Sequence, residues 1–401
     1  MVSTVDFNER LNSVRHLSDA HGRSTRLNTF FPWALLVLGM VGLIVAVAAN
    51  TTDARLAADQ DWSPFVLVTG LLLIGMVAND DGLFAAAGHH LARISSNGLV
   101  LFIGAAIMIG SVTAVLNLDT SVAFLTPVLI YTARSRGGGE APLLYGCLLL
   151  SNAGSLFLPG SNLTNLIVLG HVRMSGAHFF SIMWAPALAA LIVTAIVIAL
   201  IEHRELRLET LETTTSPPAA LGLGLVAVIA AAVLVLVLPS PALAVAAVGV
   251  IVVVWRLVTR AENLRNVFEV VGVPVLAGLF GVAVALGTLG RLWSGPATLL
   301  SHLDTWSTAG VAALVSVVVN NLPAASLLAA RTPAHPFALL IGLNLGPNLL
   351  VSGSLAWILW LKAARIAGAR PSLARASRLG VVAVPLAMAA ALAILSAKGI
   401  S

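Results

Sequence analysis

The sequence places one carboxylate between two long apolar segments. Asp119 lies in "NLDTSVAFLTP" (117–127), with apolar runs from Leu99 to Leu116 and from Val122 to Tyr131 on either side. A charged side chain at membrane depth costs at least ~2.5 kcal/mol, so it is usually paired, protonated or directed into a wet cavity. Asp119 is therefore expected to carry a proton or a cation. The alternative is that it caps the helix that follows.

Uncharged polar residues gather at this break and at three others. The motif Asn320-Asn321-Leu322-Pro323 interrupts the apolar stretch 306–330, as 117–121 interrupts 98–133, and stretches 142–170 and 336–362 also break in the middle. Irregular backbone survives in a membrane only where it lines a cavity or is buried in protein. The alternatives are ordinary turn chemistry and helix–helix hydrogen bonds. The candidate substrate- or ion-binding residues are Asn117, Asp119, Thr120, Ser121, Asn152, Ser161, Asn162, Asn165, Asn320, Asn321, Asn344, Asn348 and Ser354.

The composition supplies the elements that must position these residues. Hydrophobic residues form 58% of the 401 residues, charged residues 10%, and the mean hydropathy is +0.97. These values indicate a polytopic membrane protein. The apolar runs and their breaks predict an all-α fold with about nine transmembrane helices plus two re-entrant hairpins and two broken helices; an interrupted pair of spans is the alternative to each hairpin. The simple spans are expected at about 31–50, 64–85, 178–201, 219–238, 241–258, 266–290 and 379–396.

Several classes of function are not supported. The single Cys147 excludes an intramolecular disulfide and a three-thiolate metal site. The basic residues are scattered between spans, which does not suit nucleic-acid binding. No catalytic signature is present, so neither an enzyme nor a cofactor or metal site is expected.

The four breaks follow an internal repeat. Asn152-Ala153-Gly154 matches Asn344-Leu345-Gly346, and Ser161-Asn162 falls at the same offset as Gly353-Ser354. A hairpin followed by a broken helix, twice, is the pattern of a transporter built from inverted repeats. The expected domains are a cytoplasmic tail that is amphipathic or disordered (1–28), a first repeat (29–201), a cytoplasmic linker (202–218) and an inverted second repeat (219–401).

The distribution of basic residues supports this inverted topology. With both hairpins re-entrant and residue 1 in the cytoplasm, 17 of the 22 Lys and Arg residues lie on the cytoplasmic side and 5 on the other. This asymmetry satisfies the positive-inside rule. The expected location is the bacterial cytoplasmic membrane, with the N-terminus inside and the C-terminus outside.

From about residue 66 to residue 396, the chain resembles the arsenite/antimonite efflux permeases (ArsB type) of the ion transporter superfamily. That superfamily also holds sodium/proton antiporters and divalent-anion/citrate carriers. The resemblance is carried by "DDGLFAAAGHHLAR" (80–93), "DTSVAFLTPVLI" (119–130), "GSLFLPGSNLTNLI" (154–167), "VVNNLPAASLLA" (318–329) and "IGLNLGPNLLVSGSLAWILWL" (341–361). It implies an elevator-type carrier, in which hairpins and broken helices move against a scaffold.

The chain departs from that family at three polar positions. Arsenite permeases typically have Asp where this chain has Asn152 and Asn344, and Lys where it has Asn348, whereas the Asp of the first tip is kept as Asp119. Coupling through several titrating groups is therefore not supported. A site for a neutral polar solute such as arsenous acid is consistent with these residues.

The expected function is proton-coupled efflux of arsenite or antimonite. A sodium/proton antiporter is the alternative, because Asp119 with nearby Asn and Ser oxygens can also bind Na⁺. A dicarboxylate or citrate carrier is disfavoured, because a fixed carboxylate repels such anions. The expected partners are the small solute, the coupling proton or sodium and the lipid bilayer, with a homodimer as an open alternative.

Overall fold

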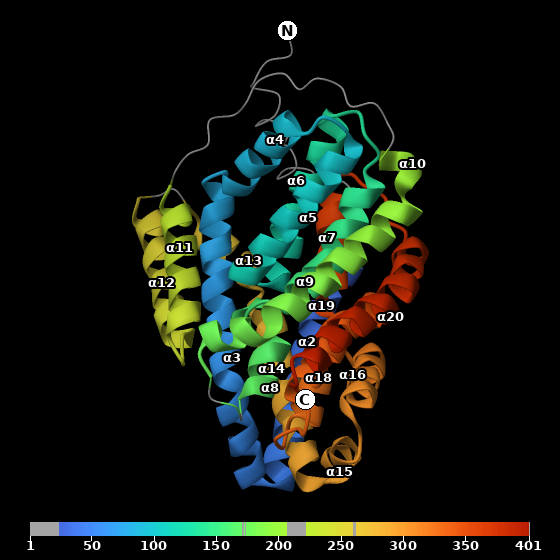
Figure 1. Cartoon of the computed structure of the whole chain (residues 1–401). Helices are drawn as coiled ribbons and strands as arrows, with labels where there is room; N and C mark the ends of the chain where they lie inside the picture. The colour runs from blue at the N-terminus through green and yellow to red at the C-terminus, as the bar shows by residue number, and fades with distance from the viewer. Residues whose placement is uncertain (1–23, 171, 173, 207–221, 260–261, 401) are drawn as a thin grey trace.

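The structure, a computed structural model, describes all residues except 1–23, 171, 173, 207–221, 260–261 and 401 (Figure 1). Regular structure in the described residues is entirely helical, which confirms the all-α prediction. The α-helices are α2 Ser24–Ala49, α3 Thr51–Asp80, α4 Leu83–Ile94, α5 Gly98–Val115, α6 Leu118–Ser135, α7 Ala141–Gly154, α8 Leu163–Leu169, α9 Gly176–Ile201, α10 His203–Leu206, α11 Leu223–Val237, α12 Ala242–Val258, α13 Leu264–Val271, α14 Val273–Leu292, α15 Gly295–Ser301, α16 Thr305–Val319, α17 Asn321–Leu328, α18 Pro336–Leu345, α19 Leu355–Ile366 and α20 Leu373–Ala397.

Six stretches of the described residues are long and apolar enough to cross a membrane. They are Pro32–Ala49, Thr51–Asp80, Gly98–Val115, Gly176–Ile201, Leu264–Leu292 and Leu373–Ala397. In the first of these only 11% of the residues are buried inside the protein, so most of its apolar side chains face outward. Such a surface suits contact with lipid tails rather than with water.

Two expected spans differ from the helices observed. The run at 64–85 covers the second half of α3 and the first residues of α4. α3 itself begins earlier, at Thr51, where Asn50 accepts a hydrogen bond from the backbone N–H of Asp53 (3.1 Å). The run at 266–290 is divided by Gly272, whose positive φ of 63° ends α13 and begins α14. Apolar runs mark the lipid-facing part of a helix, so polar extensions and a single glycine joint escape them.

Two predicted segments of the chain lie largely outside the described residues. The tail 1–28 is described only from Ser24, where α2 begins, and the linker 202–218 only as far as Leu206, which ends α10. Neither segment is therefore tested by the structure, and both stay predictions.

The two expected hairpins are formed by α5 with α6 and by α16 with α17. Their turns are at Asn117 (φ 138°) and Asn320 (φ 78°), which are the two non-glycine residues with positive φ in the described part of the chain. Asn117 Oδ1 accepts a hydrogen bond from Thr120 N (2.7 Å), and Asn320 Oδ1 accepts one from Leu322 N (3.3 Å). The helix cap is thus Asn117, and the alternative role of Asp119 as the cap is wrong. Strained backbone of this kind is usually kept at functional sites.

We expect Asn117→Ala to destabilise the protein by about 2 kcal/mol, because it removes a cap and keeps a non-glycine residue at positive φ. Asn117→Gly loses the same cap without the strain, and glycine in place of a capping residue costs only a few tenths of a kcal/mol. Thermal unfolding of the purified protein in detergent measures both. Equal unfolding temperatures for the two variants would contradict a strained tip.

The two expected broken helices are also observed. The first consists of α7, a 3₁₀ turn at Pro159–Ser161 and α8, and the second of α18, 3₁₀ turns at Gly346–Asn348 and Val351–Gly353, and α19. Each resumes as an α-helix after an extended residue, Asn162 or Ser354. The second arm of each hairpin packs against the second half of the other broken helix, α6 on α19 and α17 on α8. The breaks and tips of the two halves therefore share one core.

Other helices surround this core. α3 packs against α12, α14 and α11, and α14 packs against α2. In Figure 1, α11 and α12 stand together on the outer side of α3, while α9 and α20 cross the molecule side by side. We call α3 and α14 together the wall, because α3 contacts α6 and α8, and α14 contacts α17.

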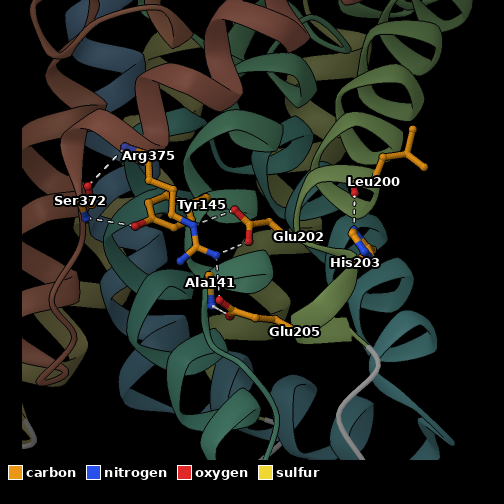
Figure 2. A network of polar contacts seen from close by, with 8 residues as sticks. All are labelled: Ala141, Tyr145, Leu200, Glu202, His203, Glu205, Ser372 and Arg375. Carbon is orange, nitrogen blue, oxygen red and sulfur yellow. Dashed lines mark hydrogen bonds and ion pairs between the residues drawn. The ribbon is translucent and has the colours of Figure 1, made fainter.

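An ion-pair network joins the ends of α9, α10, α20 and α7 (Figure 2). The Arg375 guanidinium donates to the carboxylates of Glu202 (Nε to Oε1, 2.8 Å) and Glu205 (2.7 Å to Oε1), and it lies 5.4 Å from the ring centroid of Tyr145. Glu205 Oε2 also accepts from the N–H of Ala141, at the start of α7 (3.1 Å). The network fixes the last helix of each half to the first broken helix.

Arg375→Ala is expected to lower the unfolding temperature markedly, because the Glu202 side chain is only 3% exposed and would keep an unpaired charge. Breaking a fully buried pair costs about 3–5 kcal/mol. The cost here should be smaller, because the Arg375 side chain is 42% exposed. Arg265→Ala is the matched control, since its pair with Glu269 is exposed at 85% and 62%. Similar losses in both variants would contradict the structural role of the network.

Candidate functional site

Asn344, near the end of α18, is hydrogen bonded to three residues of the first broken helix. Its Oδ1 accepts from Ser155 Oγ (2.5 Å) and from Asn162 Nδ2 (2.8 Å), and its Nδ2 donates to Asn165 Oδ1 (2.7 Å). All four side chains belong to buried residues. Asn344 is therefore a hydrogen-bonding centre between the two halves of the chain.

Asn152, the position predicted from the sequence to correspond to Asn344, also forms hydrogen bonds with the C-terminal half of the chain. Its Nδ2 donates to Asn348 Oδ1 (2.9 Å), and Asn348 Nδ2 donates back to the carbonyl of Leu149 (3.1 Å). Asn152 Oδ1 is buried and has no hydrogen-bond partner among the described residues. The two breaks thus form one amide cluster, which we define as Asn152, Ser155, Asn162, Asn165, Asn344 and Asn348.

The first hairpin tip lies against this amide cluster. Ser121 Oγ is 3.2 Å from Ser151 Oγ, one residue before Asn152. On its other side the tip meets the wall, where Thr120 packs so closely on Gly75 that a Cβ at that glycine would collide with it. Asp119 precedes both residues in the first turn of α6 and is half-buried. Within the described residues, no hydrogen bond or ion pair reaches its carboxylate.

The second hairpin tip contacts the break of its own half. Asn320 Nδ2 donates to the carbonyl of Ser352 (3.3 Å), and Ser352 Oγ donates to the carbonyl of Val317 (2.8 Å). Asn321 and Ser354 are buried here, but no hydrogen bond links either one to the amide cluster in the part of the chain that is described.

Ser161 belongs to the support of the site. Its Oγ accepts from the N–H of Leu158 (3.1 Å) and donates to the carbonyl of Ala114 (3.1 Å), near the end of α5. Both sides of its hydroxyl are therefore satisfied within the protein, and Ser161 holds the first break against the first hairpin.

Several buried polar atoms around the tips and breaks lack a partner among the described residues. An unpaired buried donor or acceptor costs about 1–3 kcal/mol, and folded proteins contain few of them. Here they include both donors and acceptors. They are Asn117 Nδ2, Thr120 Oγ1, Asn152 Oδ1, Ser354 Oγ, Thr113 Oγ1 and Thr164 Oγ1. A small ligand with hydroxyl groups, a cation with water, or water alone can satisfy such a set.

Among the described residues, the charge at this site comes from Asp119 and from helix ends. α6 begins at Leu118 and α19 at Leu355, and the two helices pack together. A helix N-terminus carries a partial positive charge, which stabilises a nearby carboxylate. In the described part of the chain, the hydrogen bonds made by the amide cluster go to amides, hydroxyls and backbone carbonyls, and none comes from Lys or Arg.

Most predicted site residues lie in this core. Two further buried polar residues, Ser155 and Asp61, are not among those predicted from the sequence. Ser155 lies inside the quoted motif "GSLFLPGSNLTNLI" (154–167), three residues after Asn152, and the structure places it beside Asn344. Asp61 was missed because the polar run before residue 64 reads as a loop, although it is buried within α3.

Comparisons with known proteins agree with a transporter. Residues 29–361 match the CitMHS family, described as "Citrate transporter". Among curated relatives, the "Arsenical pump membrane protein" of Escherichia coli is 23% identical over 358 residues, covering 81% of this chain and 83% of the relative. The protein of the same name from Yersinia enterocolitica is 23% identical over 363 residues, covering 82% and 84%.

A solved structure shows the same kind of fold. The Alcanivorax borkumensis YdaH transporter superposes with a TM-score of 0.52 at 14% identity, over 91% of this chain and 97% of that one. The match confirms the resemblance to transporters at the level of fold. By its family match, the chain belongs to the CitMHS citrate transporter family, whose members carry small solutes across a lipid bilayer, and it is a membrane transporter rather than an enzyme.

Proposed function

We propose that this protein exports arsenite or antimonite in exchange for protons. The observation that carries the proposal is the amide cluster with its unpartnered neighbours, beside Asp119 and without a Lys or Arg partner in the described residues. The proposed binding residues are those expected from the sequence: Asn117, Asp119, Thr120, Ser121, Asn152, Ser161, Asn162, Asn165, Asn320, Asn321, Asn344, Asn348 and Ser354.

The chemistry of the cluster favours a neutral polar solute. Arsenous acid is an uncharged trihydroxide near neutral pH, and its three hydroxyls both donate and accept hydrogen bonds. The unpartnered Nδ2 of Asn117 and Oδ1 of Asn152 offer one group of each kind. Citrate would bring several negative charges toward Asp119, and like charges at short range in a low-dielectric site repel by several kcal/mol. The family description therefore does not set the substrate of this chain.

Proton coupling is assigned to Asp119. An unpaired carboxylate inside a membrane protein is stable only if a proton or a cation neutralises it, or if water reaches it. Asp119 is half-buried and lacks a counter-charge within the described residues. Its alternating protonation on the two sides of the membrane would link solute export to proton entry.

The transport motion follows from the proposed repeats, 29–201 and 219–401. The matched packing of α6 on α19 and of α17 on α8 supports inverted repeats. Small residues lie where the wall meets the hairpins, Gly75 against Thr120 and Gly290 against Ala330. Such close, smooth contacts allow one body to slide past another, as an elevator mechanism requires. The N-terminus inside, the C-terminus outside and a homodimer remain parts of this proposal.

A sodium/proton antiporter is the second candidate. The unpartnered oxygens of Thr120 and Asn152, together with the Asp119 carboxylate, are ligands of the type that hard cations prefer.

Growth of a sensitive bacterial host distinguishes these functions. The gene should raise the arsenite concentration that the host tolerates, and it should leave the tolerated concentration of Na⁺ unchanged. Radiolabelled citrate uptake by the same cells should equal that of cells with the empty vector. Increased tolerance to Na⁺ without tolerance to arsenite would contradict arsenite export and support sodium/proton exchange. Citrate uptake above that of the empty vector would contradict both and support a citrate carrier.

A further inference from the structure

A second carboxylate, Asp61, is buried in the wall away from the amide cluster. Asp61 is only 1% exposed, and its Oδ2 has no hydrogen-bond partner among the residues described. Asp61 lies in α3 one turn before Phe65, whose ring packs edge-on against Phe280 of α14 (5.4 Å between centroids). A charged carboxylate in such surroundings is costly unless it is paired.

The nearest cation is committed to other groups. Arg291 of α14 acts electrostatically on Asp61 but is not within ion-pair distance of it. Its guanidinium donates instead to Gln60 Oε1 (2.6 Å) and to the carbonyl of Gly287 (2.9 Å). Asp61 is therefore best accommodated as a neutral, protonated acid while Arg291 keeps these bonds.

Gln60, the neighbour of Asp61, connects the wall to the core. Its Nε2 donates to the carbonyls of Ile167 (2.9 Å) and Ala329 (3.1 Å), at the C-terminal ends of α8 and α17. These helices belong to opposite halves of the chain and pack on each other. In the proposed elevator motion both bonds must break, because Gln60 stays with the wall. We call Gln60 and Arg291 the latch.

The charge of Asp61 can control this latch. If Asp61 loses its proton to water, the carboxylate attracts the Arg291 guanidinium and competes with Gln60 Oε1 for it. The other charged groups here are Asp53, which acts electrostatically on Arg291, and Arg331, which donates to the Arg291 carbonyl (2.8 Å). Neither residue can take the role of Asp61, because of these three charged residues only Asp61 is buried.

We propose that Asp61 is a second proton-binding residue of this transporter, and that its loss of a proton draws Arg291 away from Gln60 and thereby frees Gln60 to leave the carbonyls of α8 and α17. The inference rests on the proposed elevator motion but not on arsenite as the substrate. Proton coupling then involves one carboxyl in the core, Asp119, and one in the wall, Asp61.

The test follows a cysteine at position 330, next to Ala329, whose carbonyl accepts from Gln60, across a range of pH and without substrate. Ala330 is 4% exposed and faces Gly290 of the wall, and Cys147 is the chain's single native cysteine. In the purified Cys147→Ser, Ala330→Cys protein, maleimide labelling, normalised to a free thiol at each pH, should accelerate at least tenfold between acidic and alkaline pH. With Asp61→Asn it should stay slow throughout, whereas with Asp119→Asn it should keep its pH dependence.

Two results would overturn the proposal. One is labelling that does not respond to pH in the parent protein, and the other is an unchanged response in the Asp61→Asn variant. Asp61→Glu should restore the response, which a merely structural role for Asp61 would not predict. The labelling assay contains no solute. A failure of arsenite export in growth assays would therefore not change its result, so the two proposals can fail independently.

Discussion

Asp119→Asn is expected to abolish proton-coupled arsenite export while the protein remains at least as stable as the wild type. The substitution keeps the size of the side chain and removes a carboxylate that has no hydrogen-bond partner in the described residues. Removing an unpaired charge from a membrane core costs no stability. Activity and stability should therefore change independently. The rate of arsenite transport should fall at least about tenfold, which corresponds to ~1.4 kcal/mol in the free-energy barrier of transport.

Asp81→Asn is the matched control for this prediction. The Asp81 carboxylate, directly after the end of α3, is paired with Arg256 and also accepts from the N–H of Gly224 (2.7 Å). Its loss should lower the unfolding temperature and leave the pH-gradient dependence of transport intact. The two variants thus have opposite expected patterns. Gradient-dependent export in Asp119→Asn would contradict the assignment of coupling to that residue.

The second large effect is expected for Asn344→Leu, a change of similar volume at the centre of the amide cluster. Asn162 Nδ2 loses its buried acceptor and Asn165 Oδ1 loses its donor, whereas Ser155 Oγ keeps the carbonyl of Asn152 as an acceptor (2.7 Å). Stranding a buried polar group costs about 1–3 kcal/mol. In membrane proteins interhelical hydrogen bonds average only ~0.6 kcal/mol, so the total should be roughly 2–4 kcal/mol. The purified variant should therefore have a lower unfolding temperature and a lower affinity for arsenite.

Asn344→Asp separates the acceptor from the donor at the same position. The carboxylate oxygen continues to accept from Ser155 and Asn162, so the variant should be more stable than Asn344→Leu, although the bond to Asn165 is lost. It should also retain more arsenite binding. Equal behaviour of the two variants would mean that the hydrogen bonds of Asn344 contribute nothing beyond packing.

The sequence predicted those parts of the fold that depend on local chemistry. Gly, Pro and Asn interrupt apolar runs, and the structure has its hairpin turns at Asn117 and Asn320 and its helix breaks before Asn162 and Ser354. Breaks inside apolar segments are a strong signal, because membrane helices otherwise keep their backbone hydrogen bonds. Composition together with the length of the apolar runs was enough to predict an all-helical membrane protein.

Contacts between distant segments could not be predicted in this way. The bond between Asn152 and Asn348 depends on how two halves of the chain pack, and no local pattern specifies it. Asp61 and Gln60 lie in a polar run that hydropathy assigns to a loop, yet both belong to α3. A helix can carry polar residues into the protein interior when its partners are other helices rather than lipid, and hydropathy does not register such partners.

Arsenite flux into proteoliposomes containing only the purified protein tests the central claim most directly. With an acidic interior, proton exit should drive arsenite accumulation above the external concentration, and a protonophore that collapses the gradient should stop it. Asp119→Asn vesicles should show neither effect. Arsenite uptake that is unaffected by collapse of the pH gradient, or no arsenite uptake at all by the wild-type protein, would contradict proton-coupled arsenite export.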